Sequence, residues 1–174
     1  MNSPVSRPSS STRSKVAKGG SVVAIALALA VSALRIDEGK RNVDYLDIAK
    51  VPTACFGHTG PDVEVGTIRS DEECETLLTQ DARQHLVGVM RCTPGIADRP
   101  HQLAAATRLA FNIGVPRYCS STVARRFNAG RWHEACDAFG MWRMAGGKVV
   151  RGLVLRRQRE REMCLVDLPA EGER

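Results

Sequence analysis

The most informative segment of the chain is Glu38-Gly-Lys-Arg-Asn-Val-Asp-Tyr-Leu-Asp-Ile-Ala-Lys-Val-Pro-Thr-Ala-Cys-Phe-Gly-His-Thr-Gly60. It places an acid, a second carboxylate and a hydroxyl at Glu38, Asp47 and Thr53, ahead of a turn-like segment that ends at Gly60. Hydrolysis of a sugar acetal needs such a set, because a protonated carboxyl group donates to the leaving oxygen while an ionised one activates water. The hydroxyl can orient that water. These residue types are common, so the spacing alone does not identify an enzyme.

The segments on either side of this stretch predict the rest of the fold. Residues 44–68 are rich in β-branched side chains and broken by prolines and glycines, which predicts β-hairpins. Ser70-Asp-Glu-Glu73 is a capping box and begins an amphipathic helix that we expect to reach about Met90. Further helices are expected over residues 100–112, 120–128, 131–144 and 152–166. The order predicts an α+β fold, with a small β-hairpin lobe, a mainly helical lobe and the cleft between them.

Length and charge limit the class of protein. The chain has 174 residues and a mass of 18.9 kDa, which suits one domain with a real core. A hydrophobic content of 43% and a charged content of 25% are typical of a globular protein. The net charge of +6 indicates a polyanionic partner. Peptidoglycan with its anionic polymers and nucleic acid would both satisfy that charge.

The N-terminal residues differ in kind from the rest. Residues 1–18 are basic and residues 19–34 carry no charge. A helix of that uncharged length spans about 24 Å, less than the roughly 30 Å hydrocarbon core of a bilayer. Basic residues ahead of it predict that the N-terminus stays in the cytoplasm and that the chain after Leu34 is exported. Val31-Ser32-Ala33 also fits a signal-peptidase site, so a cleaved signal peptide is one interpretation.

Six cysteines follow the export segment, which fits disulfides in an oxidising compartment. Sequence leaves fifteen connectivities open. We predict the near-neighbour set, in which each bridge closes a loop of about 20–30 residues: Cys55–Cys74, Cys92–Cys119 and Cys136–Cys164. The alternative is metal binding, because Cys55-x-x-His58 and His133-x-x-Cys136 have ligand-like spacing. We disfavour it, because these pairs are far apart and export favours oxidation, and we expect no metal and no cofactor.

Further motifs follow the acid, carboxylate and hydroxyl in a fixed order. They are Gly57-His-Thr-Gly60, Phe111-Asn-Ile-Gly114, Trp142 with Ala145-Gly-Gly-Lys148, and Gly152-Leu153 leading to Arg156-Arg157 and Glu160. Together with Glu38-Gly39, Asp47 and Thr53 they resemble the phage-type lysozymes, the muramidase endolysins of tailed phages, over roughly residues 36–165. The resemblance implies a lysozyme-like catalytic domain over residues 35–168, before a frayed tail at 169–174. It also implies that Glu38 is the general acid, Asp47 the second carboxylate and Thr53 its water-positioning partner.

The resemblance also suggests which residues contact substrate. The candidates are His58, Phe111, Asn112 and Trp142. We expect His58 to shape the cleft edge by hydrogen bonding rather than to donate a proton, and Asn112 to contact the acetamido groups of the glycan. Phe111 and Trp142 serve packing as readily as binding. The charged run from Arg156 to Arg161 is expected to be a solvated helix face with opposite charges interleaved.

The function expected from the resemblance is hydrolysis of the β-1,4 bond between N-acetylmuramic acid and N-acetylglucosamine, for host lysis at the end of a phage cycle. It favours inversion, with Asp47 assisting the attack of water. Two alternatives remain: a lytic transglycosylase, which cuts the same bond with one acid and no water, and a non-enzymatic cationic wall-binding protein. We expect a monomer that acts on peptidoglycan and binds no nucleic acid.

Some endolysins of this kind carry a signal-anchor-release segment, a weakly apolar helix that tethers the enzyme and then leaves the bilayer uncleaved. By this resemblance residues 19–34 are expected to hold the enzyme on the host inner membrane before it becomes periplasmic. Leu34 and Glu38 are so close in sequence that the tethered enzyme would hold its acid at the membrane face. The expected outcome is an inactive tethered state and an active released state.

Overall fold

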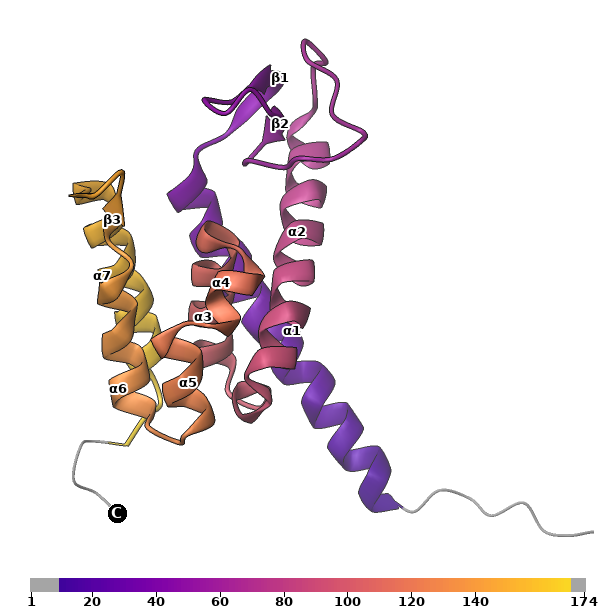
Figure 1. Cartoon of the computed structure of the whole chain (residues 1–174). Helices are drawn as coiled ribbons and strands as arrows, with labels where there is room; N and C mark the ends of the chain where they lie inside the picture. The colour runs from indigo at the N-terminus through magenta and orange to yellow at the C-terminus, as the bar shows by residue number, and fades with distance from the viewer. Residues whose placement is uncertain (1–9, 170–174) are drawn as a thin grey trace, which may run out of the picture.

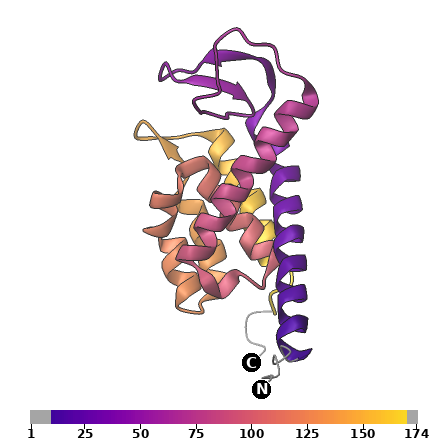
Figure 2. The ribbon, with the colours of Figure 1, turned by 90° about the vertical axis from the view of Figure 1, so that its right-hand side faces the viewer.

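One long helix, α1 (Ser10–Glu38), connects the two lobes of the molecule and runs along one side of the helical lobe (Figures 1 and 2). The computed structural model describes the backbone of residues 10–169 and the side chains of residues 20–169. Half of the predicted basic segment, residues 1–9, and most of the predicted tail, residues 170–174, lie outside the described residues. The helix ends at Gly39, whose φ of +66° is a left-handed conformation that glycine adopts at little cost.

The β lobe follows directly and holds one hairpin. Strand β1 (Arg41–Leu46) pairs antiparallel with β2 (Pro52–Cys55), and an isolated bridge joins Val43 to Ile68. Asp44 is fully enclosed and accepts hydrogen bonds from Arg69 Nε at 3.0 Å and Nη2 at 2.9 Å. This ion pair ties the end of the loop back to the first strand. Most of the 44–68 region is therefore irregular chain wrapped around a single hairpin, where several hairpins were expected.

The helical lobe begins with α2 (Asp71–Cys92), which starts at the predicted capping box of Ser70 and Glu73. It continues with η1 (Pro94–Ile96), α3 (Pro100–Ile113), α4 (Val115–Cys119), α5 (Thr122–Asn128), α6 (Trp132–Asp137), η2 (Ala138–Met141), β3 (Met144–Ala145), β4 (Lys148–Val149) and α7 (Arg151–Leu165). The helix expected over residues 131–144 stops at Asp137 and tightens into a 3₁₀ turn. The short α4 and the β3–β4 hairpin were not predicted.

The core consists of two clusters of buried side chains, and α1 contributes to both. Ala26 and Ala30 belong to the helical-lobe cluster, where they lie with fully buried alanines of α3. Val31 and Leu34 belong to the second cluster, with Phe56 of the β lobe and residues of α2. Small side chains let helix backbones approach closely, which explains why an alanine-rich helix can pack well here. The segment predicted to enter a membrane is thus part of the folded core.

Three disulfides cross-link segments that are distant in the sequence. They join Cys55 to Cys74, Cys92 to Cys119 and Cys136 to Cys164, which is the near-neighbour set predicted above. The first connects the β lobe to α2, and the third connects α6 to α7. These bridges pair all six cysteines of the sequence, each of which lies in the part of the chain that the structure describes.

Candidate active site

Glu38 is the last residue of α1, and its side chain is held by the other end of the chain. Arg156 of α7 donates from Nη1 to Glu38 Oε1 at 2.5 Å, across a separation of 118 residues. The Glu38 side chain is 22% exposed, whereas that of Arg156 is 7% exposed. The acid is therefore open to solvent on one side and fixed by a buried cation on the other. A charge-assisted bond of this kind is short and defines orientation as well as energy.

Asp37, the residue before Glu38, anchors the same turn of α1 from beneath. Its carboxylate is fully enclosed and accepts from Arg108 Nη2 of α3 and from Arg159 Nη2 of α7, both at 2.7 Å. Arg156 Nε lies 3.6 Å from the same group. Three arginines from two helices thus converge on the end of α1, and they fix where the helix stops and where Glu38 points.

Asp47 and Thr53 are both hydrogen-bonded to the backbone of Val51. Asp47 Oδ1 accepts from the backbone N–H of Val51 at 2.8 Å, and Thr53 Oγ1 donates to the carbonyl of Val51 at 2.9 Å. Asp47 is half-buried, and Thr53 is only 4% exposed. Thr53 pairs with Tyr45 in the hairpin register, so the two strands fix the spacing of this pair. The carboxylate and the hydroxyl therefore form one unit of the β lobe.

Both ring nitrogens of His58 lie within hydrogen-bond distance of carboxylates, which indicates a structural role. Nδ1 lies 2.8 Å from Asp81 Oδ2 of α2, and Nε2 lies 3.2 Å from Asp62 Oδ1. Partial burial opposes the charged form, but the hydrogen bonds and charges of Asp81 and Asp62 outweigh it and raise the pKa of His58 above its ordinary value. The side chain binds the β-lobe loop to α2. Its position agrees with the expected hydrogen-bonding role, and its contact with substrate stays a prediction.

The other three candidates lie on the helical lobe. Phe111 packs against His85, with ring centroids 4.9 Å apart, and borders the second core cluster. Asn112 is exposed beside it near the end of α3. Trp142 follows η2 and packs against the helical-lobe core. Phe111 and Trp142 therefore have clear packing roles, while the exposed amide of Asn112 is free of the core and suited to binding.

The expectation of a solvated face over Arg156 to Arg161 is wrong for half of that run. Arg156, Arg157 and Glu160 are 6%, 2% and 0% exposed, and they point into the molecule toward α1 and α3. The i, i+1 and i+4 positions of these residues fall within one side of the helix, and the same three residues belong to the motif that resembles the phage-type lysozymes. Burial of two arginines was not foreseeable without the acidic residues of α1 that face them.

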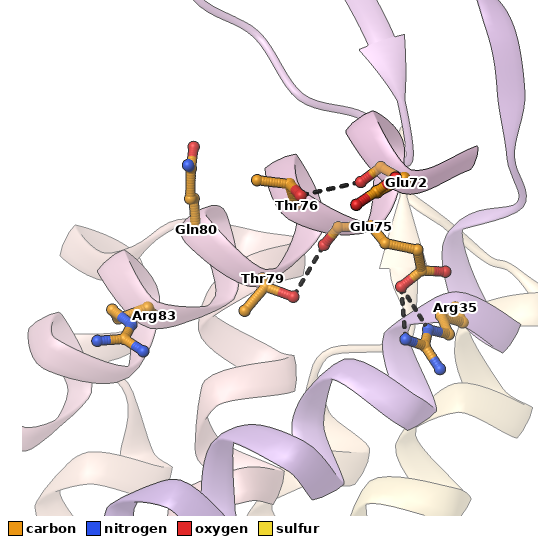
Figure 3. Close-up of a pocket in the computed structure, with 7 residues that line it drawn as sticks. All are labelled: Arg35, Glu72, Glu75, Thr76, Thr79, Gln80 and Arg83. Atoms are coloured by element: carbon orange, nitrogen blue, oxygen red, sulfur yellow. Dashed lines mark hydrogen bonds and ion pairs between the residues drawn. The ribbon is translucent and has the colours of Figure 1, made fainter. Parts of the chain in front are cut away.

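A groove between α1 and α2 lies elsewhere on the surface. It has a volume of about 410 Å³ and is lined by residues of the two helices, as Figure 3 shows: Arg35, Glu72, Glu75, Thr76, Thr79, Gln80 and Arg83. Arg35 Nε donates to Glu75 Oε2 at 2.7 Å and links the two helices there. None of the three predicted catalytic residues lines this groove. It is a mixed-charge surface and differs from the site built around Glu38.

Comparison with known proteins gives consistent results. The family model described as phage lysozyme matches residues 35–160. The SAR-endolysin of Enterobacteria phage P21 is 39% identical over 152 residues, which covers 84% of this chain and 90% of that protein. A P22 lysozyme mutant has a TM-score of 0.68 at 32% identity, covering 78% of this chain and 94% of that one. The muramidase domain of SpmX from Asticaccaulis excentricus has a TM-score of 0.70 at 26% identity, covering 80% and 95%.

These findings define the class as a lysozyme-like glycoside hydrolase with an N-terminal apolar helix. The chain belongs to the phage lysozyme family. It is a peptidoglycan-lytic endolysin, and its enzymatic class is muramidase. Residues 20–38 are long and apolar enough to cross a membrane by length and composition, with a mean hydropathy of 1.8, which fits an exported, membrane-anchored start.

Proposed function

We propose that the enzyme hydrolyses the β-1,4 bond between N-acetylmuramic acid and N-acetylglucosamine, with Glu38 as general acid, Asp47 as the second carboxylate and Thr53 as the partner that orients water. Glu38 protonates the leaving glycosidic oxygen while Asp47 draws a proton from the attacking water. Support comes from the hydrogen bonds of Asp47 and Thr53 to the backbone of Val51, which tie a carboxylate and a hydroxyl to the same residue of the β lobe.

The observation that carries the proposal is the position of Glu38. It ends a helix, it remains partly exposed, and a buried arginine from α7 fixes it. A carboxylate used only for surface charge would need no such partner, because exposed ion pairs contribute little to stability. Preorganised groups of this kind are what a general acid requires.

The test is mass spectrometry of the soluble products released from purified sacculi by the wild type and by Glu38→Gln. The amide cannot donate the required proton, so reducing N-acetylmuramic ends should appear with the wild type and fall at least about 100-fold in the variant. Glu64→Gln, at an exposed position of the β lobe, is the matched control and should keep full activity. Anhydro ends would identify a transglycosylase, and activity in folded Glu38→Gln would refute the assignment.

The role of the second carboxylate is tested by the stereochemistry of the product. Asp47→Asn should reduce turnover severely and Thr53→Ala at least substantially, because both act on the attacking water. Proton NMR of the first product formed should show the inverted α-anomer. A retained β-anomer would mean that Asp47 acts as a nucleophile or as an electrostatic stabiliser instead.

We also propose that α1 has two successive positions, first in the host inner membrane with its N-terminus in the cytoplasm, then packed on the released, periplasmic enzyme. Ala26, Ala30 and Leu34 are each 0% exposed in the folded enzyme. A helix whose residues contact lipid cannot make these contacts, so the membrane position and the docked position exclude each other. Release of α1 would then complete the turn that carries Asp37 and Glu38.

The burial of α1 favours release over cleavage. Removal of the chain up to Ala33 would delete Ala26, Ala30 and Val31 from the two core clusters. Loss of buried side chains destabilises a domain by several kcal/mol in total, at roughly 2–5 kcal/mol for a large one. Intact mass of the periplasmic enzyme is the test. A full-length mass is expected, and detection of only a form that begins at Leu34 would contradict the proposal.

A further inference from the structure

A second acid–base cluster lies behind Glu38, and the reaction proposed above does not use it. Glu160 of α7 is fully buried, and its Oε1 accepts from Arg157 Nη2 at 2.8 Å and from Arg156 Nε at 3.3 Å. Arg157 itself is 2% exposed. Two cations and one anion are therefore enclosed on consecutive turns of one helix.

This cluster is costly for the fold. Among the residues that the structure describes, Glu160 Oε2 and the Nε and Nη1 atoms of Arg157 have no hydrogen-bond partner. Burial raises the pKa of Glu160 to about 7, although Arg157, Arg156 and Arg108 act in the opposite direction. A buried ion pair is often no more stable than a pair of apolar side chains of the same volume. Stability alone therefore gives a poor reason for these charges.

The geometry of Arg156 suggests another reason. Its Nη1 donates to Glu38, its Nη2 donates to the carbonyl of Arg108 at 3.3 Å, and its Nε faces both Glu160 and Asp37. All three nitrogens are thus directed by different acceptors. An arginine side chain has many rotamers, and only a full set of acceptors holds the planar fork in one of them. Glu160 supplies the acceptor for Nε, and Glu38 the acceptor for Nη1.

We propose that Glu160 is a positioning residue, which fixes the guanidinium group of Arg156 so that Nη1 meets Glu38. The inference rests on the proposed function, in which Glu38 is the general acid. Arg157 compensates the charge of Glu160, because its Nη2 donates to the same Oε1 atom that accepts from Arg156 Nε. The charged groups around Glu160 are Arg156 and Arg157 on α7, Arg108 on α3, and Asp37 and Glu38 on α1.

The test compares Glu160→Gln with Glu162→Gln in the full-length, released enzyme. Glu162 is exposed on the same helix, so the control makes the same change without touching the cluster. We expect Glu160→Gln to lower kcat about tenfold with KM within about twofold on soluble peptidoglycan fragments, because only the alignment of the acid changes. The control should match the wild type in both constants.

The pH profile separates positioning from simple loss of packing. Neutralising Glu160 leaves the charge of Arg156 less compensated beside Glu38, so the alkaline limb of the kcat profile should move to lower pH. A purely structural effect would lower the rate at all pH values without moving the limb. An unchanged limb in folded Glu160→Gln, whatever its kcat, or a wild-type kcat would overturn the proposal.

A second variant covers the case in which Glu160→Gln does not fold because Arg157 is left uncompensated. Arg157→Met combined with Glu160→Gln removes both buried charges, and we expect it to fold and to show the same roughly tenfold loss of kcat. Wild-type kcat in the folded double variant, or failure of both variants to fold, would overturn the positioning role. Glu38→Gln, measured in parallel, reports separately on the proposed function, since activity there would refute the acid itself.

Discussion

The two faces of α1 differ in how far the folded enzyme buries them. The inner face holds Ala26, Ala30 and Leu34 in the core and ends in the enclosed carboxylate of Asp37. The outer face exposes Ala24 and Ala28, with Ile25 at 47% exposure, and ends at Arg35. A bilayer would contact both faces alike, whereas the folded protein uses one. Under the two-position proposal for α1, the apolar residues of the outer face serve export and tethering, and those of the inner face serve both positions.

The largest effect is expected at the enclosed end of the inner face. Asp37→Asn removes the charge on which Arg108, Arg156 and Arg159 converge. Breaking a buried ion pair costs about 3–5 kcal/mol, because the remaining charges stay buried without compensation. Urea unfolding of the released enzyme measures this. Asp98→Asn, at an exposed position, is the matched control. A loss below about 0.5 kcal/mol, the range of ordinary surface changes, would mean that Asp37 does not hold α1 in place.

The contact between His58 and Asp81 lies outside α1 and gives a stability change with which the changes on the two faces of α1 can be compared. His58→Asn removes the link from the β-lobe loop to Asp81. Because the folded protein raises the pKa of His58, the stabilisation is fully present below its ordinary value of about 6.5 and is lost as pH rises through the folded pKa. We expect a loss of roughly 1.5–3 kcal/mol at pH 5.5 and a smaller loss at pH 9. Equal losses at both pH values would show that the charge of His58 is not what stabilises the loop.

Leucine substitutions test the two faces with equal changes in hydropathy. Ala30→Leu places a large side chain against α3, and overpacking a tight interface costs roughly 1–3 kcal/mol. Ala28→Leu extends over a hollow of about 340 Å³ that Ala28 lines with Leu27 and Val31, and should change stability by less than about 0.5 kcal/mol. Both should retain the same larger fraction of enzyme in the membrane pellet. Equal free energies of unfolding for soluble Ala30→Leu and Ala28→Leu would contradict the difference in packing between the two faces.

The smallest effect is expected at the outer end of α1. Arg35→Gln removes the ion pair with Glu75 at the groove in Figure 3, where the two side chains are 49% and 37% exposed. Solvated pairs of this kind contribute about 0.2–1 kcal/mol, and salt screens them. The difference between wild type and variant should shrink between low salt and about 1 M salt. A large loss that salt leaves unchanged would place the docking contact on the outer face instead.

Local signals in the sequence predicted much of this fold. The capping box at Ser70, the glycine after α3 and the spacing of the cysteines each depend on neighbours along the chain, and the structure agrees with them. The catalytic and substrate-contact residues were predicted from family resemblance, and their roles stay predictions. The β3–β4 hairpin was missed because each strand is only two residues long, too short for an alternating pattern.

Long-range contacts explain what the sequence could not reveal. Arg156, Arg157 and Glu160 look like a solvated charged face, and only the acids of α1, over a hundred residues away, make their burial possible. The apolar segment 19–34 likewise predicts a membrane helix. Nothing in its composition shows that its alanines pack in one cluster with the alanines of α3. The predicted boundary between the export segment and the catalytic domain stays a prediction. In the folded enzyme, residues of the export segment and of the catalytic domain lie in the same two clusters of buried side chains.

We propose that the export helix packs one face into the core of the released enzyme. Hydrogen exchange of the full-length soluble protein, read by mass spectrometry over residues 20–38, tests it most directly. Amides that depend on core packing exchange only when the whole domain unfolds. Our account predicts that the amides from Ala26 to Leu34 are as slow as those of α3. Rapid exchange there, with α3 still protected, would mean that α1 is detached in the released enzyme and would contradict the claim.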